Sequence, residues 1–546
     1  MIKAAESGII KIEKLRKGVE CMGQYLNVGN AGFTNIRNGL YVDKTGLIAF
    51  INSTLETMDK LTCVSRPRRF GKSYAAKMLC AYYDSDCDSR KLFEGLAIAK
   101  NSSFDKHLNQ HNVIYLDITW FINGAENIKD TVKNLQNEVI EDLHKAYPNV
   151  KKEKNLQQML YSISQSKEEK IKFIIIIDEW DALFREAKND KELQEEYIKL
   201  LRSLFKSNFT DDMIEAAYIT GILPIKKYGT QSAMTDFRER TMLQPKPLEE
   251  YVGFTEEEVR KLCAGSKLNF EDIQKWYDGY ILGENTHIYN PKSVLEAIEF
   301  SCLDNYWTQS ETYESLKFYI EMDFNGLKES IIQMLSGESC PIRIGSFQND
   351  MTNIKRKDDV LTLLVHLGYL AYDSVNKTVS IPNEEIRQEF LLTLEEGKYS
   401  EVIKLMNDST QLLEDTLNMD SEAVALALEE AHNSGLTPLF YNNEQALRSV
   451  IRLAYISCED GYIRFEEFPS GKGYADIAFI PINKPNKPII LIELKWNKTA
   501  KSAIEQIKNK NYPKRFEKLE NDILLVGINY NEKTQQHTCQ IELHKR

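Results

Sequence analysis

Gly71, Lys72 and Ser73 carry the clearest chemical signal in this chain of 546 residues. They close the stretch 66–73, RPRRFGKS, which fits the phosphate-binding loop G-x-x-x-x-G-K-[ST] at every fixed position except the first. In such a loop the lysine reaches the β- and γ-phosphates of a nucleotide, and the hydroxyl group binds Mg²⁺. The residues expected to surround a bound nucleotide are Arg69, Phe70, Gly71, Lys72, Ser73 and Tyr74.

Arg66 occupies the position of the loop's first glycine, where glycine normally allows a tight turn at little steric cost. The apolar run 60–65 predicts a buried strand before the loop, and the segment 73–83 predicts a helix after it. This order favours a nucleotide site, because a helix N-terminus offers free N–H groups and a partial positive charge. The alternative is a basic stretch that contains Gly-Lys-Ser by chance.

Asp178 and Glu179 follow the run KFIIII, which predicts a central parallel strand buried on both faces. Carboxylates at the C-terminal end of such a strand lie where ligands bind in open α/β sheets. We therefore expect Asp178 to hold Mg²⁺ and Glu179 to polarise the attacking water. The alternative is a strand-ending turn in which an aspartate only caps the next segment. Thr220, at the end of another predicted strand, is a candidate sensor of the γ-phosphate.

Asp476, Glu493 and Lys495 form a second candidate site on the predicted strands GYADIAFIP and IILIELKW, which the turn residues NKPNKP join. Residues two apart on a strand face the same side, so Glu493 and Lys495 are expected together, with Asp476 opposite. Two carboxylates can hold the metal ion that phosphodiester hydrolysis needs, and a nearby lysine can act on the water. The alternative is a surface salt bridge, which the apolar frame PIILI argues against.

The neighbouring helices supply accessory candidates. Glu444 lies near the start of the amphipathic helix FYNNEQALRSVIRLAY and is a further candidate metal ligand. Gln506 and Tyr512 belong to a helix expected downstream of the two strands.

The composition limits the classes of protein that fit the chain. Its hydrophobic and charged contents, 42% and 27%, are those of globular proteins. The N-terminal segment lacks the apolar core of a signal peptide, and no run approaches a membrane span, so a cytoplasmic protein without membrane contact is expected. Nine cysteines without a C-x-x-C pair argue against disulfides and zinc. The net charge of −12 restricts any contact with nucleic acid to local regions, such as the lysine-rich segment 484–518. The alternative for this segment is a solvent-exposed surface without a ligand.

These stretches, in their order along the chain, resemble the bacterial AAA-ATPase-like proteins that carry a C-terminal PD-(D/E)XK nuclease-superfamily domain. The resemblance covers nearly the whole chain, and the family's loop tolerates arginine at the first position. Asp43 and Lys44 lie in one of the matching stretches, to which no physical role is assigned. The stretches that carry the resemblance are YVDKTGLI, RPRRFGKS, IIIIDEWDALF, GFTEEEV, WYDGY, YNPKSVL, LLVHLGYL, IPNEEIR, GYADIAFIP and IELKW.

The expected architecture is α/β throughout, with the segment 358–394 predicted to form a helix, a hairpin that turns near Asn376, and a second helix. The expected regions are 1–230, an AAA-like P-loop ATPase core with a parallel sheet; 231–320, a helical lid; 321–400, a winged-helix-like arm; 401–435, a helical linker; and 436–546, a restriction-endonuclease-like α/β domain.

The resemblance implies an ATPase with ATP and Mg²⁺ as cofactors, and Mg²⁺ or Mn²⁺ at a nuclease site. The residues that carry over are Lys72, Ser73, Asp178 and Glu179 for the ATPase, and Asp476, Glu493 and Lys495 for the nuclease, with Glu444 and Gln506 as accessory positions. The candidate arginine fingers are Arg202, Arg238 and Arg240.

We therefore expect an ATP-regulated, Mg²⁺-dependent DNA endonuclease in anti-phage defence or mobile-element biology. Homo-oligomers would be compatible with this function. The alternative is a nucleotide-dependent switch whose nuclease-like domain only binds nucleic acid or a protein partner.

Overall fold

The computed structural model divides the chain into two compact units, Met1–Leu316 with Ser339–Glu389, and Lys317–Glu338 with Phe390–Arg546. The residues that the structure describes are 23–166, 170–225, 234–307, 313–320, 324, 326–335, 337–347, 354–396, 400–433, 447–448, 450–451, 454–455, 458, 462–470, 473–481, 487–516 and 521–545.

The first unit is built on a five-stranded sheet with the order β2-β3-β4-β1-β5, in which all neighbours are parallel. Every residue of β1 and β3 is buried, as expected for strands covered on both faces. The predicted parallel sheet is thereby confirmed. Its strands are β1 (Leu61–Ser65), β2 (Asn112–Asp117), β3 (Phe173–Asp178), β4 (Ile214–Gly221) and β5 (Arg238–Arg240).

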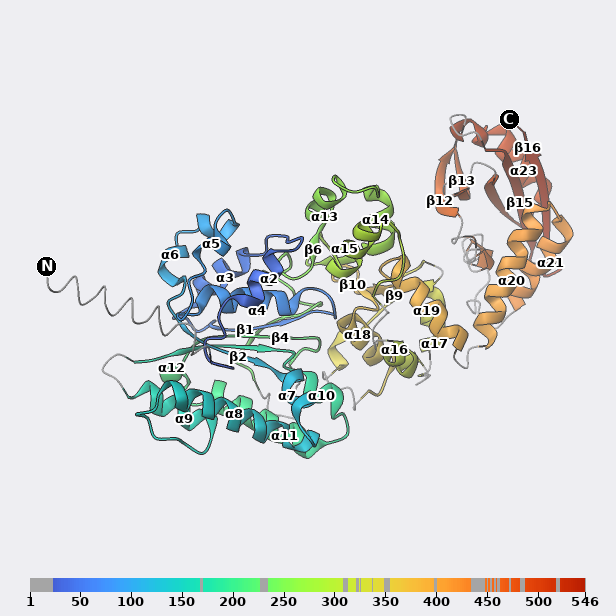
Figure 1. The fold of residues 1–546 in the computed structure, drawn as a ribbon. Helices are drawn as coiled ribbons and strands as arrows, with labels where there is room; N and C mark the ends of the chain where they lie inside the picture. The colour runs from blue at the N-terminus through green and yellow to red at the C-terminus, as the bar shows by residue number, and fades with distance from the viewer. Residues whose placement is uncertain are drawn as a thin grey trace. The chain divides into compact units, whose positions relative to one another are not determined.

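Helices cover both faces of this sheet (Figure 1). The helices α8, α9 and α11 lie on one face, where leucines and isoleucines at helical spacing join the aliphatic strand residues in one core. The helix α4, which follows the loop, lies on the other face. The helices of this part are α2 (Ala31–Arg37), α3 (Gly46–Thr54), α4 (Lys72–Tyr83), α5 (Arg90–Phe93), α6 (Phe104–His107), α7 (Ile118–Gly124), α8 (Thr131–Ala146), α9 (Leu156–Ser164), α10 (Ala182–Glu186), α11 (Lys191–Phe205) and α12 (Thr210–Met213).

A smaller subdomain follows the sheet and combines helices with a three-stranded antiparallel sheet of order β6-β8-β7. Its core contains Phe254, Val259, Ile273, Tyr289 and Val294. The sequence pattern predicted the helices but not this sheet, because its strands are only two to four residues long. Its elements are β6 (Phe254–Thr255), α13 (Glu256–Cys263), α14 (Phe270–Tyr277), β7 (Tyr280–Leu282), β8 (Thr286–Tyr289) and α15 (Pro291–Phe300).

The predicted helix, hairpin and helix of the winged-helix-like region are present. The hairpin turns at Asn376, whose backbone N–H donates to Asp373 Oδ1 at 3.0 Å. A short strand, β9, pairs with β11 and completes a three-stranded sheet. The elements from residue 313 to 396 are α16 (Tyr313–Ile320), α17 (Leu327–Leu335), β9 (Cys340–Pro341), α18 (Lys357–Leu367), β10 (Ala371–Asp373), β11 (Thr378–Ser380) and α19 (Glu384–Glu396). Of these, α17 belongs to the second unit, and the boundary between the units falls within α16 and within α19.

The second unit contains a mixed five-stranded sheet of order β12-β13-β14-β15-β16, in which only β14 and β15 are parallel. Side chains of α20 and α21 join the core on one face of the sheet, and side chains of α23 join the core on the other. The segment expected as a linker thus contributes to the packing of the sheet. The elements are α20 (Ser400–Leu417), α21 (Ser421–Asn433), β12 (Tyr462–Ser470), β13 (Gly473–Pro481), β14 (Ile489–Trp496), α23 (Ala500–Asn509), β15 (Ile523–Asn531) and β16 (Gln536–His544).

Among the described residues, no helix has both the length and the apolar character that crossing a membrane requires.

Candidate functional site

The loop 66–73 connects the end of β1 with the first residue of α4, Lys72. Gly71 precedes the helix with φ of 90°, a left-handed conformation that glycine adopts without steric cost. Arg69 is also left-handed, with φ of 70°, although it carries a Cβ atom. The strand, loop and helix that the sequence predicts are therefore all present, and the free N–H groups of the first turn of α4 face the loop region.

Arg66 is fully buried and does not line the nucleotide-sized pocket described below. Its Nη1 donates to the carbonyl oxygens of Ser65 and Arg240 at 2.9 and 3.0 Å, and its Nη2 donates to that of Leu248 at 3.3 Å. Burial lowers the pKa of Arg66 to about 10, which leaves the guanidinium charged at neutral pH. Arg66 therefore replaces the usual glycine with a side chain that ties β1 to β5 and to the segment after it.

We expect Arg66→Gly, which restores the common form of the loop, to destabilise the protein by about 2–4 kcal/mol, because buried carbonyl oxygens lose their donors. Urea-induced unfolding of the full chain measures the effect. Arg69→Gly is the matched control, because Arg69 is exposed and left-handed, so this change should alter stability by no more than about 1 kcal/mol. Equal stability of Arg66→Gly and the wild type would contradict the structural role of Arg66.

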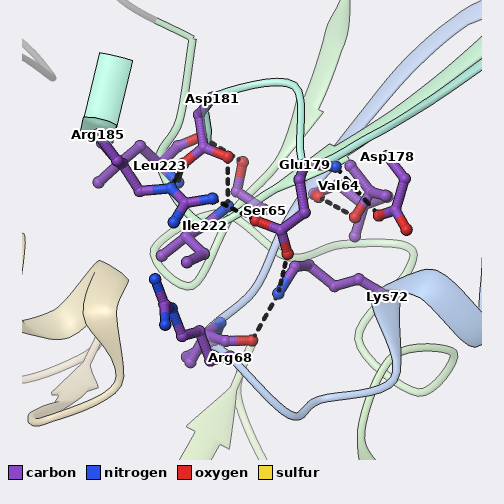
Figure 2. A network of polar contacts seen from close by, with 12 residues as sticks. Val64, Ser65, Arg68, Lys72, Asp178, Glu179, Asp181, Arg185, Ile222 and Leu223 are labelled. Atoms are coloured by element: carbon purple, nitrogen blue, oxygen red, sulfur yellow. Dashed lines mark hydrogen bonds and ion pairs between the residues drawn. The ribbon is translucent and has the colours of Figure 1, made fainter. Parts of the chain in front are cut away.

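Lys72 points from α4 towards the carboxyl end of β3 (Figure 2). Its Nζ atom donates to the carbonyl oxygen of Pro67 at 2.9 Å and lies 3.8 Å from Glu179 Oε1. Burial lowers the pKa of Lys72, while the charges of Glu179 and Asp178 act in the opposite direction. The ammonium group thus lies between the loop and the acidic pair, where it can contact a phosphate.

Asp178 is the last residue of β3 and is almost completely buried. Its Oδ2 atom accepts from the Tyr115 hydroxyl at 3.5 Å. Burial raises the pKa of Asp178 to about 6, and the neighbouring Ser73 hydroxyl counteracts this shift. A bound cation would favour the ionised form, so a buried carboxylate beside a serine hydroxyl fits a Mg²⁺ site.

Glu179 follows β3 in a left-handed conformation, with φ of 51°. Burial by itself would raise the pKa of Glu179, but Lys72, Arg185 and Arg68 together hold it below its ordinary value. The carboxylate is therefore ionised at neutral pH, as a residue that polarises water must be.

These residues line a pocket of about 810 Å³, which is large enough for a nucleotide. One part of its lining is polar and comes from the loop and from the residues after β3. Another part is apolar or aromatic and comes from the segment before α3, the residues around β6 and the helix α15; it consists of Tyr41, Val42, Tyr251, Phe254, Pro291 and Leu295.

Lys44 connects the segment before α3 to the small subdomain, whereas Asp43 fixes the same segment to the backbone at Ala97, so both residues have a structural role. Lys44 Nζ lies 2.5 Å from Glu258 Oε2 and donates to the Glu250 carbonyl oxygen at 2.7 Å. Asp43 accepts from the backbone N–H groups of Thr45 and Ala97 at 2.9 and 2.7 Å. The sequence stretch that holds them thus fixes one wall of the pocket.

The other candidates for this site lie elsewhere. Thr220 is buried, its hydroxyl donates to the Val64 carbonyl oxygen at 3.1 Å, and it is not among the residues that line the pocket. The candidate fingers Arg202, Arg238 and Arg240 are not among them either, whereas Arg68, Arg69 and Arg185 are. The sequence did not predict Arg185 as a pocket residue, because its place in the site depends on contacts that no motif indicates.

The second candidate site lies on β13 and β14, which form the predicted antiparallel pair. Ile477 pairs with Ile492, so the register places Asp476 level with Glu493. Asp476 Oδ2 accepts from the backbone N–H of Leu494 at 2.8 Å, and Lys495 Nζ lies 2.9 Å from Glu493 Oε1. The structure therefore brings the three predicted residues together, and all three are buried.

The two carboxylate oxygens of Glu493 differ in their hydrogen bonding. Oε1 accepts from Lys495 and from the amide of Gln506, whereas the buried Oε2 atom has no hydrogen-bond partner among the residues that the structure describes. Burial, and then the charge of Asp476, raise the pKa of Glu493 to about 7. A buried carboxylate oxygen without a donor, next to a second carboxylate, fits a divalent cation.

Arg448 is an additional residue of this site, and sequence reasoning missed it. Its Nη2 atom lies 2.7 Å from Asp476 Oδ1. Tyr512 also belongs to the site, because its hydroxyl accepts from Gln506 Nε2 at 3.3 Å. The predicted ligand Glu444 lies outside the described residues.

Comparisons with known proteins agree with this division into two sites. The model of a family described as predicted AAA-ATPase matches residues 27–230, and that of the PD-(D/E)XK nuclease superfamily matches residues 442–539. A search of curated proteins finds no match.

The chain also has low-scoring similarity to two solved structures. The Walker-type ATPase of Pyrococcus abyssi is 14% identical, with a TM-score of 0.32 over 64% of this chain and 94% of that chain. The ORC2 protein of Aeropyrum pernix, solved as ADPNP-ADP complexes, is 12% identical, with a TM-score of 0.30 over 66% of this chain and 97% of that chain.

The loop with Lys72 and the acidic pair lie within the first matched range, and the cluster of Asp476, Glu493 and Lys495 lies within the second. Residues 27–230 are therefore similar to the family described as predicted AAA-ATPase, and residues 442–539 are similar to the PD-(D/E)XK nuclease superfamily.

Proposed function

We propose that the protein is an ATP-regulated, metal-dependent DNA endonuclease. The observation that carries the proposal is the buried cluster on β13 and β14, in which Asp476, Glu493 and Lys495 meet as the nuclease chemistry requires. The ATPase-like domain of the same chain supports nucleotide control of this activity. Metal-dependent cleavage of DNA by the purified full-length protein, with and without ATP, tests the whole proposal.

The pocket in the first unit supports ATP as the nucleotide. Lys72 and the N-terminus of α4 would hold the phosphates, and Ser73 with Asp178 would hold Mg²⁺, which neutralises phosphate charge. The aromatic and apolar lining, such as Tyr41, Tyr251 and Phe254, offers stacking surface to a base. Glu179 would orient and polarise the attacking water.

We expect Lys72→Ala to weaken ATP binding at least about tenfold, because one charged hydrogen-bond donor to the phosphates is removed. Isothermal titration calorimetry in Mg²⁺ measures the change. Lys77→Ala is the matched control, because Lys77 lies on the exposed side of the same helix. Equal ATP affinity of Lys72→Ala and the wild type would exclude Lys72 from the phosphate site.

In the second unit, Asp476 and Glu493 would hold Mg²⁺ or Mn²⁺, and the metal supplies the Lewis-acid chemistry of phosphodiester hydrolysis. Lys495 lies beside Glu493 and can position or deprotonate the attacking water. Gln506 contributes by fixing the Glu493 carboxylate in its orientation. DNA is the proposed substrate, and the lysine-rich segment 484–518 is its proposed electrostatic contact, so binding should weaken steeply with salt.

The second candidate function is a nucleotide-dependent switch whose nuclease-like domain only binds nucleic acid or a protein. The ion pair between Arg448 and Asp476 favours this function, because it neutralises a carboxylate that a metal ion would otherwise engage. Metal titration separates the two functions. The endonuclease must bind Mn²⁺ through Asp476 and Glu493, whereas the switch does not need to.

A further inference from the structure

Arg185 is a pocket-lining side chain to which the sequence motifs assign no role. It lies on α10, and its Nη2 atom forms an ion pair and hydrogen bond with Glu179 Oε2. The Arg185 side chain is only 10% exposed. The Glu179 side chain is 23% exposed, so the pair is partly buried and is screened less by water and salt than a fully exposed pair, which strengthens the constraint on the glutamate.

Arg185 is itself held in place by the end of β4. Its Nε atom lies 3.2 Å from Asp181 Oδ2, and Asp181 accepts from the backbone N–H groups of Ile222 and Leu223 at 3.1 and 2.8 Å. Figure 2 shows this chain of contacts running from the backbone through Asp181 and Arg185 to Glu179. Gly221 is part of the arrangement, because a Cβ atom there would lie 2.4 Å from Asp181 Oδ1.

The conformation of Glu179 needs a constraint of this kind. Its left-handed backbone, with φ of 51°, is unfavourable for a residue with a Cβ atom and persists only where the surroundings impose it. Lys72 Nζ lies 3.8 Å from the Oε1 atom of this carboxylate, and the charge of Arg68 also acts on Glu179. A bound triphosphate would attract the Lys72 ammonium group away from this contact, whereas Arg185 would keep its contact with Asp181.

We propose that Arg185 is the positioning residue for Glu179, which it holds in the orientation for water activation once Lys72 has turned to the phosphates. This proposal rests on the proposed ATPase function of Glu179. Arg185 acts through the carboxylate and does not touch the nucleotide. Its removal must therefore slow turnover while nucleotide affinity stays the same.

A double-mutant cycle tests the proposal in the full-length protein, with Arg185→Gln, Glu179→Gln and the double variant. Arg185→Gln should lower kcat for ATP hydrolysis at least about tenfold and leave the Kd for ATP within about threefold of the wild type. In the Glu179→Gln background, the same change should have no further effect on kcat, because the group that Arg185 positions is already absent. Arg185→Lys keeps the charge and should recover part of the lost rate.

Each other outcome overturns the proposal. Equal losses of kcat in both backgrounds would show that Arg185 acts independently of Glu179. A weaker ATP affinity in both backgrounds would show that it contacts the phosphates. A lowered unfolding midpoint for both Arg185→Gln and Arg185→Lys, with proportionate loss of ATP binding, would show a purely structural ion pair.

Failure of the proposed ATPase function gives a different pattern. If Glu179→Gln hydrolyses ATP at the wild-type rate, Glu179 does not activate the water. The proposed ATPase function of Glu179 is then wrong, and the double-mutant cycle cannot assign a role to Arg185. If Glu179→Gln is slow but Arg185→Gln matches the wild type, only the role of Arg185 is refuted.

Discussion

Asp476→Ala and Glu493→Ala variants are each expected to cleave DNA at least about a thousandfold more slowly than the wild type. In the proposed mechanism the two carboxylates would hold the metal, and the loss of several kcal/mol of transition-state stabilisation corresponds to a rate change of this size. Lys495→Ala should lower the rate as well, since its ammonium group lies 2.9 Å from Glu493 Oε1. A gel assay with labelled DNA and Mg²⁺ or Mn²⁺ measures these rates.

Glu505→Ala is the matched control, because Glu505 is an exposed carboxylate on α23, next to Gln506 in the sequence. It should cleave DNA like the wild type. ATP affinity should be unchanged in both carboxylate variants, since all described residues that line the nucleotide pocket belong to the first unit. Wild-type cleavage by Asp476→Ala or Glu493→Ala would remove these residues from the nuclease site.

Glu179→Gln should bind ATP normally and hydrolyse it at least about a hundredfold more slowly, which is the usual scale for the loss of a general base. The amide keeps the shape of the side chain, but it cannot accept a proton. Single-turnover measurements of phosphate release at saturating ATP separate the chemical step from nucleotide binding and product release.

Glu195→Gln is the control for this change, because Glu195 is an exposed glutamate on α11 outside the pocket lining. It should hydrolyse ATP at the wild-type rate. If Glu179→Gln shows the same rate as Glu195→Gln, the water must be activated by another group. The next candidate would be Asp181, whose oxygens accept two backbone N–H groups and contact Arg185.

The sequence was sufficient to predict elements whose environment is uniform along their length. The run of isoleucines in β3 has no polar face, so it can only be a strand covered on both sides. The strands β13 and β14 were predictable because turn residues separate two short apolar runs, and the spacing of Glu493 and Lys495 then fixes a common face. In each case the local pattern and the tertiary position agree.

The roles of several residues near the nucleotide pocket could not be predicted, because they depend on partners distant in the sequence. Arg66 reaches the carbonyl oxygens of Arg240 and Leu248, more than 170 positions away. Lys44 meets Glu258 across a separation of 214 residues. A motif describes the residues that contact the ligand, but it does not describe those that support the loop.

In the nuclease-like cluster, too, the sequence predicts only the residues whose partners are close in the chain. The grouping of Asp476, Glu493 and Lys495 was predictable from their spacing within one hairpin, and Gln506 was predictable from its place on the next helix. Arg448 belongs to a segment 28 residues before Asp476, and no period of a helix or strand connects the two. Its ion pair with a proposed metal ligand could be recognised only after the chain had folded.

DNA cleavage by the purified full-length protein tests the central claim most directly. Single-stranded, duplex and branched DNA should be incubated with Mg²⁺ or Mn²⁺, with and without ATP, and the products resolved on a denaturing gel. We predict metal-dependent cleavage of at least one of these substrates, an ATP-dependent change in its rate, and loss of that change in Lys72→Ala. Intact DNA under every condition, from protein that binds ATP, would contradict the endonuclease and leave the nucleotide-dependent switch as the function of this chain.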